Sequence, residues 1–225
     1  MLTSDIELVV ADDPVRVAAE HLAAAVVRGG EIALSGGSSP RPAYELASRL
    51  APDWRCARVW LGDERCVPPD DERANVRLVR ESLASTSHLP ELRPVDTSLS
   101  PADAAAAYDE ELAGVTLDLA FQGIGPDGHT ASLFPDAPSL DETDRRAVGA
   151  AAGLEPWVDR VTMTVPFLCA ARQVLYLVLG EGKAEAARRA FAEPPDRATP
   201  ASLVRSTAGR TIAILDPPAA RLLDR

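Results

Sequence analysis

The sequence predicts a doubly wound α/β fold, in which a mostly parallel sheet carries helices on both faces. Two observations predict it. Short β-type runs alternate with longer runs of helical periodicity, an alternation typical of parallel sheets. The chain has 225 residues, and doubly wound folds of that size commonly form one unit. We therefore expect a single domain over residues 1–225 with one main site.

The predicted elements follow one another in a regular order. The first helix is the clearest, because Pro14 opens a segment in which apolar residues recur at three- and four-residue spacing. Strands are expected at residues 6–10, 31–35, 57–61, 117–122, 161–165, 173–179 and 211–215. In such sheets, ligands bind beyond the carboxyl ends of the strands. The segments that follow the strands are therefore the places to look for a site.

Composition limits the partners of the protein. The formal net charge of −11 disfavours a nucleic-acid partner, which needs a basic face. A small anionic substrate is compatible with that charge, because screening confines charge effects to about 8 Å at physiological salt. The sequence shows no signal peptide, and it has no apolar run of the ~20 residues that a membrane span needs. The spacing of the three cysteines is typical neither of disulfides nor of a metal site. We expect a cytoplasmic protein with no membrane partner.

A glycine-rich segment follows the second expected strand and leads into a helix, with Ser39 placed as an N-cap and Pro40 as the first helical residue. Glycines let main-chain N–H groups approach a ligand, and a helix start favours an anion, so phosphate is the expected guest. A nucleotide P-loop is excluded because the Gly-Lys-Ser/Thr ending is missing. A plain glycine turn is the alternative. The candidate binding residues are Ser35, Gly36, Gly37, Ser38 and Ser39.

A polar segment of about fourteen residues follows the third expected strand, and loops of that length are usually functional or mobile. Asp63, Glu64 and Arg65 place two carboxylates and a guanidinium close to the end of the strand. A solvated run of charges is the alternative interpretation of this segment.

A third segment, after the fourth expected strand, ends in Gly-Pro-Asp-Gly-His. Its Gly-x-Gly-x-x-Gly pattern does not indicate a dinucleotide site, because the residues after His129 stop at Pro135 instead of forming a long helix. The loop presents Asp127 and His129, and a histidine oriented by a carboxylate is the usual equipment of a general base. His21 and His88 are expected on the surface. No spaced set of metal ligands and no Gly-x-Ser-x-Gly elbow is present, which favours metal-independent chemistry without an acyl-serine.

These three segments together resemble the 6-phosphogluconolactonase family, in their order and spacing. The stretch Asp-Gly-His-Thr-Ala-Ser-Leu-Phe-Pro is highly specific, and the segments 160–166, 182–184 and 200–204 are similar as well. The resemblance covers roughly residues 5–216. It implies hydrolysis of 6-phospho-D-glucono-1,5-lactone to 6-phosphogluconate, in the oxidative pentose phosphate pathway and without a cofactor.

The resemblance also implies roles for residues. His129 would deprotonate water, Asp127 or backbone polar groups would hold the imidazole tautomer, and Arg65 or loop N–H groups would stabilise the oxyanion. Asp63 is expected to contact sugar hydroxyls rather than act as a base. Substrate binding is further assigned to the glycine-rich segment and to Gly125, Arg160 and Lys183.

Two alternatives share parts of this pattern. Amino-sugar-phosphate isomerases or deaminases carry a glutamate five residues after the histidine, where this chain has Phe134, which cannot move a proton. A non-enzymatic sugar-phosphate sensor would need a DNA-reading helix pair and a basic surface, and neither is visible. Two departures from the family are Ser39, where many members carry threonine, and Phe121-Gln122; if Gln122 faces the ligand, it would shift substrate preference.

Overall fold

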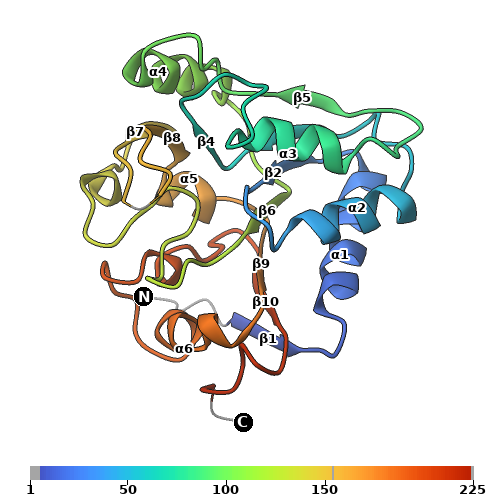
Figure 1. Cartoon of the computed structure of the whole chain (residues 1–225), viewed down its shortest axis with the longest axis vertical. Coiled ribbons are helices and arrows are strands. Elements are labelled where there is room, and N and C mark those ends of the chain that lie inside the picture. Colours follow the sequence, from blue (N-terminus) through green and yellow to red (C-terminus); the bar gives the residue numbers. More distant parts are fainter. Residues whose placement is uncertain (1–5, 154, 224–225) are drawn as a thin grey trace.

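The computed structural model describes residues 6–153 and 155–223, and its centre is a seven-stranded sheet whose strands are all parallel (Figure 1). The strand order is β1-β10-β9-β6-β2-β3-β5. This sheet confirms the predicted doubly wound architecture. Its strands are β1 Ile6–Val10, β2 Glu31–Leu34, β3 Arg58–Leu61, β5 Glu91–Arg93, β6 Leu119–Gln122, β9 Gln173–Val178 and β10 Arg210–Leu215.

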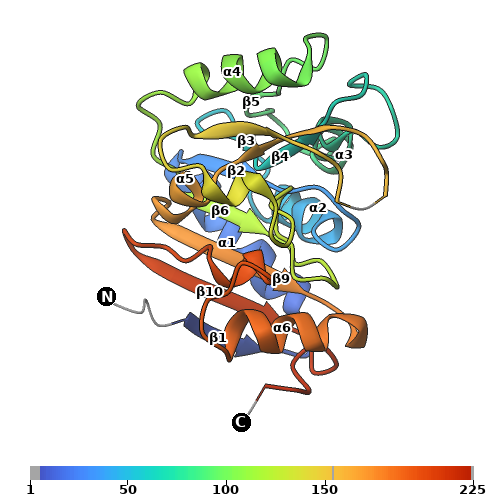
Figure 2. The ribbon, with the colours of Figure 1, turned by 90° about the vertical axis from the view of Figure 1, so that its left-hand side faces the viewer.

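Helices cover both faces of the sheet, and each face has its own apolar core. One core joins the sheet to α1 Pro14–Arg28, α2 Arg41–Leu50 and α3 Asn75–Ser82. The other core joins it to α4 Pro101–Glu111, α5 Val165–Cys169 and α6 Ala184–Phe191, with α4 and α6 at opposite ends of that face (Figure 2). Short 3₁₀ turns lie at Pro138–Asp141, Glu181–Lys183 and Pro200–Ser202. None of the helices among the described residues is long and apolar enough to cross a membrane.

The first helix shows why the sequence folds this way locally. The side chain of Asp13 accepts a hydrogen bond from the N–H of Arg16, and Pro14 supplies the first helical residue. Gly29 ends the helix in the left-handed conformation and donates to the carbonyl of Val26. The apolar stripe predicted from the sequence is the face that packs on the sheet.

A second, smaller sheet was not predicted. It is antiparallel and consists of β4 Asp63–Arg65, β8 Arg160–Met163 and β7 Ala147–Ala150. The strand expected at 161–165 was therefore assigned to the wrong sheet, because a short buried run does not reveal its neighbours. The polar segment after β3 was expected as a loop but begins with strand β4. Its charged residues gave no strand signal, since their burial depends on partners far away in the sequence.

The strand order creates a crevice at the carboxyl edge of the main sheet. β2 and β6 are neighbours, but the chain continues from β2 toward β3 and β5 and from β6 toward β9 and β10. The loops after β2 and β6 therefore leave in opposite directions. Doubly wound proteins bind ligands at such a switch point.

Candidate active site

One pocket lies at this switch point, and it collects nearly all the residues proposed from the sequence. The predicted residues that line it are Ser35, Gly36, Gly37, Ser38, Ser39, Asp63, Arg65, Gly125, His129, Arg160 and Lys183. Asp127 does not line the pocket but is bonded to His129. The small sheet contributes β4 and β8, so the sheet missed from the sequence forms one wall of the site.

The histidine and its carboxylate are held in a tight loop after β6. Nδ1 of His129 lies 2.6 Å from Oδ1 of Asp127, and the loop closes through a hydrogen bond from the N–H of Gly125 to the carbonyl of His129. A Cβ atom on Gly125 would lie 2.0 Å from Nδ1, so this position requires glycine. Burial opposes ionisation of Asp127, but the hydrogen bond and charge of His129 outweigh it and lower the pKa of Asp127. An ionised carboxylate only accepts, so Nδ1 carries the proton and Nε2 of the neutral ring is left as the base.

Phe134 lies close to both this histidine and a buried cation. Its ring centroid lies 5.1 Å from that of His129 with a 45° tilt, and the guanidinium carbon of Arg160 lies 5.9 Å from the same ring centroid. The position at which a deaminase would need a carboxylate is therefore an apolar ring near His129 and Arg160.

Three cations converge on the pocket although the chain is strongly acidic. The pairing of β4 with β8 sets Arg65 directly opposite Arg160, and Lys183, the only lysine in the sequence, ends the 3₁₀ turn before α6. Burial, and then the neighbouring Arg65, lower the pKa of Arg160. Burial also lowers the pKa of Lys183, and the charge of Asp127 partly opposes that effect. An anionic ligand would stabilise these cations, because it would offset both their mutual repulsion and the cost of their burial.

Backbone carbonyls hold the two arginines in place. Arg160 donates to the carbonyls of Pro156 and Val158 at 3.0 and 3.1 Å, and Arg65 donates to the carbonyl of Arg73 at 2.6 Å. These neutral carbonyl groups help to orient the two guanidinium groups.

The glycine-rich segment differs from its prediction in one respect. Helix α2 begins at Arg41, Pro40 precedes it, and no side chain caps its first turn, so the predicted N-cap role of Ser39 is wrong. The turn 38–40 continues into the helix with α-type dihedrals at Pro40, which moves the start of the helix along the chain. The base of the segment is fixed by Tyr44, whose hydroxyl accepts from the N–H of Ser35 and donates to its carbonyl.

The adjacent carboxylates of β4 have different environments. Asp63 faces the pocket and accepts a hydrogen bond of 2.6 Å from Ser132. Glu64 is 1% exposed and accepts hydrogen bonds from the N–H groups at the start of α3, so it caps that helix and does not line the pocket.

Gln122, at the end of β6, is buried and accepts a hydrogen bond from the hydroxyl of Thr130. It does not line the pocket, so it does not face a ligand there.

Several lining residues were not proposed from the sequence. They are Pro40, Gly123, Ile124, Thr130, Ala131, Phe134, Glu155, Leu177, Val178 and Leu179. Leu177, Val178 and Leu179 lie at the carboxyl end of β9, so the carboxyl-edge rule could have found them. Glu155 follows no expected strand and carried no such signal.

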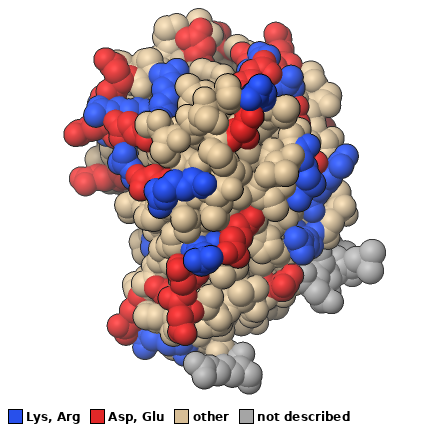
Figure 3. All heavy atoms as spheres, turned by 90° about the vertical axis from the view of Figure 1, so that its right-hand side faces the viewer, with Lys and Arg blue, Asp and Glu red and all other residues tan. Residues whose placement is uncertain are grey.

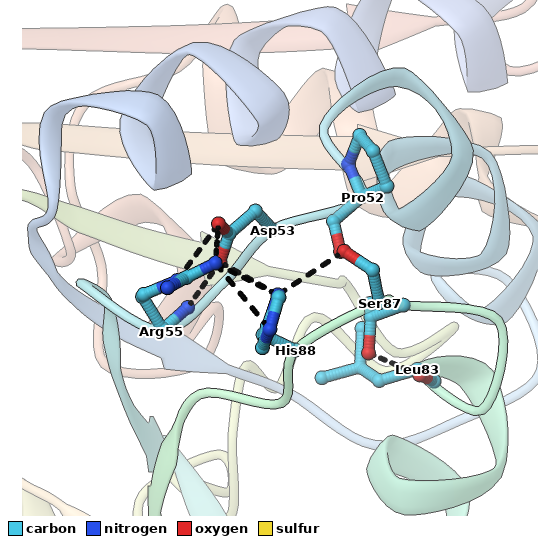
Figure 4. Close-up of polar contacts among 7 residues, drawn as sticks. Pro52, Asp53, Arg55, Leu83, Ser87 and His88 are labelled. Atoms are coloured by element: carbon cyan, nitrogen blue, oxygen red, sulfur yellow. Dashed lines mark hydrogen bonds and ion pairs between the residues drawn. The ribbon is translucent and has the colours of Figure 1, made fainter.

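The other two histidines lie elsewhere. His88 is exposed, as predicted, and belongs to a polar cluster with Asp53, Arg55 and Ser87 before β5 (Figure 4). His21 was expected on the surface but is half-buried, with Nδ1 3.3 Å from Nε2 of Gln173. Among the described residues, no three His, Cys, Asp or Glu side chains are grouped to hold a metal ion.

The fold and the pocket define a class of protein: doubly wound α/β proteins with a cation-lined pocket beside a histidine–carboxylate pair. The family described as glucosamine-6-phosphate isomerases/6-phosphogluconolactonase matches residues 8–213. The chain belongs to this family, and the resemblance proposed from the sequence is confirmed.

Relatives and solved structures agree with this assignment. The human 6-phosphogluconolactonase is 37% identical over 206 residues, which cover 85% of this chain and 80% of the human protein. The 6-phosphogluconolactonase of Synechocystis is 36% identical over 200 residues, covering 83% and 82%. The structure of the Thermotoga maritima 6-phosphogluconolactonase superposes with a TM-score of 0.83 at 29% identity, covering 94% of this chain and 99% of that one. A monomeric glucosamine-6-phosphate deaminase, 17% identical with a TM-score of 0.85 and covering 97% and 99%, shares the fold alone.

Proposed function

We propose that this chain hydrolyses 6-phospho-D-glucono-1,5-lactone to 6-phosphogluconate without a metal, with His129 as general base. The observation that carries the proposal is the hydrogen-bonded His129–Asp127 pair, whose histidine lines a pocket that three cations also line. The relatives named 6-phosphogluconolactonase support the substrate.

In this mechanism His129 carries out both proton transfers of the reaction. Nε2 of His129 takes a proton from water while the water oxygen attacks C1 of the lactone. The carbonyl oxygen becomes an oxyanion, to which Arg65 or the loop N–H groups donate, a contribution commonly of about 10²–10³ in rate per donor. Collapse of this intermediate breaks the bond between C1 and the ring oxygen, and the imidazolium returns its proton to that oxygen. The product acid then loses a proton to solvent.

The remaining polar residues bind the two ends of the substrate. The segment from Ser35 to Ser39, Arg160 and Lys183 bind the phosphate, and Asp63 accepts hydrogen bonds from sugar hydroxyls. Binding energy from the phosphate, remote from the reacting carbon, can be used to orient the ring. Asp127 fixes the imidazole tautomer through Nδ1.

The test is a hydrolysis assay on phosphorylated and unphosphorylated gluconolactone, with the spontaneous rate subtracted, beside an assay for ammonia release from glucosamine 6-phosphate. We expect a lactonase rate and no ammonia, since Phe134 occupies the place of the deaminase carboxylate. Ammonia release without lactonase activity would overturn the proposal. Activity should survive prolonged chelation, and recovery that depends on added zinc or magnesium would contradict the metal-independent mechanism.

We further propose that the chain acts as one domain, in the cytoplasm and with no nucleic-acid partner. The net charge of −11 supports the last point, because nucleic-acid binding needs a basic face. Both apolar cores share the strands of one sheet, which supports a single folding unit.

A further inference from the structure

We infer that Asn75 is a positioning residue that fixes the carboxylate of Asp63 in the pocket. Asn75 is fully buried at the first turn of α3, and it does not line the pocket itself. The effect that we expect of Asn75 on kinetics rests on the proposed lactonase function. The hydrogen bond between Asn75 and Asp63 can be tested independently of the reaction.

Two neutral side chains hold the carboxylate of Asp63 from opposite sides. Nδ2 of Asn75 donates to the backbone carbonyl of Asp63 at 2.8 Å and to Oδ1 at 3.2 Å, while the hydroxyl of Ser132 donates to Oδ2 at 2.6 Å. Asn75 and Ser132 are both inaccessible to solvent, and Asp63 is 5% exposed. Each carboxylate oxygen is therefore restrained by a donor that leaves its charge in place, and the group cannot rotate without breaking a hydrogen bond.

Asn75 is itself held by the neighbour of Asp63. The carboxylate of Glu64 accepts from the main-chain N–H groups of Asn75 and Val76, at 2.7 and 2.8 Å, where the positive end of the α3 dipole lies. Burial raises the pKa of Glu64, and the hydrogen bonds from the backbone oppose that rise. The two adjacent carboxylates are thus linked through α3. Glu64 holds the first turn of this helix, which contains Asn75, and the side chain of Asn75 holds Asp63.

The orientation of the amide is determined by what lies on each side of it. A Cβ atom on Gly36 would lie 1.8 Å from Oδ1 of Asn75, so the amide packs directly against the glycine-rich segment. Oδ1 is buried and has no hydrogen-bond donor. Turning the amide over would bring Oδ1 against two oxygens of Asp63, which cannot donate. The hydrogen bonds to Asp63 therefore decide the orientation, and Gly36 provides the space for it.

The sequence makes this inference directly measurable, because Asn75 is its only asparagine. Selective labelling with ¹⁵N-asparagine gives one side-chain amide pair. We expect one of its protons to resonate downfield and to exchange slowly in the wild type, and both properties to be lost in Asp63→Asn. Asp127→Asn is the matched control, since it removes a carboxylate of the same site that is not bonded to Asn75. An amide signal that is the same in Asp63→Asn and the wild type would overturn the inference.

Kinetics test the consequence for the reaction. We expect Asn75→Ser to lower kcat/KM by about ten- to a hundredfold, the range for a misplaced site group. The loss should be equal on phosphorylated and unphosphorylated lactone, because Asp63 is assigned to the ring. The double variant Asp63→Asn/Asn75→Ser should be no worse than the more damaging single variant. A loss confined to the phosphorylated substrate, or losses that multiply, would show that Asn75 does not act through Asp63.

Ser132→Ala provides a second route if Asn75→Ser does not fold. It removes the donor to Oδ2 but leaves Asn75 intact, and it should also couple non-additively to Asp63→Asn. Additive losses in this cycle would contradict the positioning of Asp63. If the wild type itself has no lactonase rate, the proposed function fails, whereas the amide spectrum still decides the role of Asn75.

Discussion

Two clusters in this molecule pair a histidine with an aspartate, and they lie at opposite ends of the strands of the parallel sheet, on different strands. His129 and Asp127 follow β6, at the carboxyl edge, whereas Asp53 and His88 precede β3 and β5, at the amino edge. In the first cluster, Oδ1 of Asp127 lies 2.6 Å from Nδ1 of His129. In the second, Oδ1 of Asp53 lies 3.6 Å from Nδ1 of His88, and Nη2 of Arg55 lies 3.1 Å from Nδ1 and 3.3 Å from Nε2 of the same ring (Figure 4).

The two clusters share residue types but differ in position, and only the first lies at the pocket for which we propose the chemistry. Ser87 and Asp53 both approach Nδ1 of His88, and the hydroxyl of Ser87 donates to the carbonyl of Pro52, so no serine–histidine–aspartate relay exists there. At the carboxyl edge, the loops after β2 and β6 diverge and leave a pocket into which three cations project. Elsewhere charges of both signs are mixed, as on the face shown in Figure 3.

The largest expected effect separates the two histidines. His129→Asn removes the proposed general base, and we expect kcat to fall by about two to four orders of magnitude. His88→Asn alters an exposed side chain, so its kcat and KM should stay within about twofold of the wild type. Both rates are measured above spontaneous hydrolysis, after circular dichroism has shown a native fold. A well-folded His129→Asn variant with a near-normal rate would remove the distinction between the clusters.

The next effect concerns the cations. Lys183→Ala and Arg160→Ala should each reduce kcat/KM on the phosphorylated lactone by at least about tenfold, roughly 1.4 kcal/mol. The slower reaction of unphosphorylated gluconolactone should barely change, because it lacks the group that these cations bind. Arg55→Ala, at the amino edge, is the matched control and should affect neither substrate. Equal losses on both substrates would place Lys183 and Arg160 at the reacting centre or in the structure.

A smaller effect is the pH dependence of product binding. Burial lowers the pKa of Lys183, so its charge is lost at a lower pH than that of an exposed lysine. In the proposed site the charged form binds phosphate, so affinity for 6-phosphogluconate should weaken as pH rises through this lowered pKa. Asp127→Asn should lower the pKa further, since the charge of Asp127 opposes the shift. Reductive ¹³C-methylation of the only lysine gives an NMR titration, and an ordinary lysine pKa in that titration would contradict the prediction.

The sequence was informative where a signal is local. Helical periodicity predicted α1 and the alternation that forms the parallel sheet, and the glycine-rich loops after β2 and β6 stood out as short patterns. The carboxyl-edge rule then brought these loops together correctly.

The missed features depend on contacts between distant segments. β4 and β8 pair across almost a hundred residues, at a register of Asp63 with Thr162, and no pattern within either strand specifies that partner. The same applies to the bonds from Asn75 and Ser132 to Asp63 and to the packing of Phe134 against Arg160. Burial of polar residues follows from such partners, so the sequence left open whether Glu64 belongs to the site or to a solvated run of charges.

The smallest expected effect is the stability contributed by the cluster at the amino edge. Hydrogen bonds from Arg55 lower the pKa of Asp53, so its stabilising contribution is present above the pKa of the unfolded chain and is lost as pH falls through the folded-state value. Exposed ion pairs contribute little, and Asp53→Ala should shift Tm by no more than about 2 °C at pH 7. The difference from the wild type should begin to shrink below the ordinary aspartate pKa of about 3.9, vanish only below the lowered pKa of the folded state, and also shrink in high salt. Calorimetry of both proteins across pH measures it. A large, salt-insensitive loss of Tm would show that this cluster is a structural element comparable to the buried network around Asp63, and that solvent exposure does not distinguish the two edges.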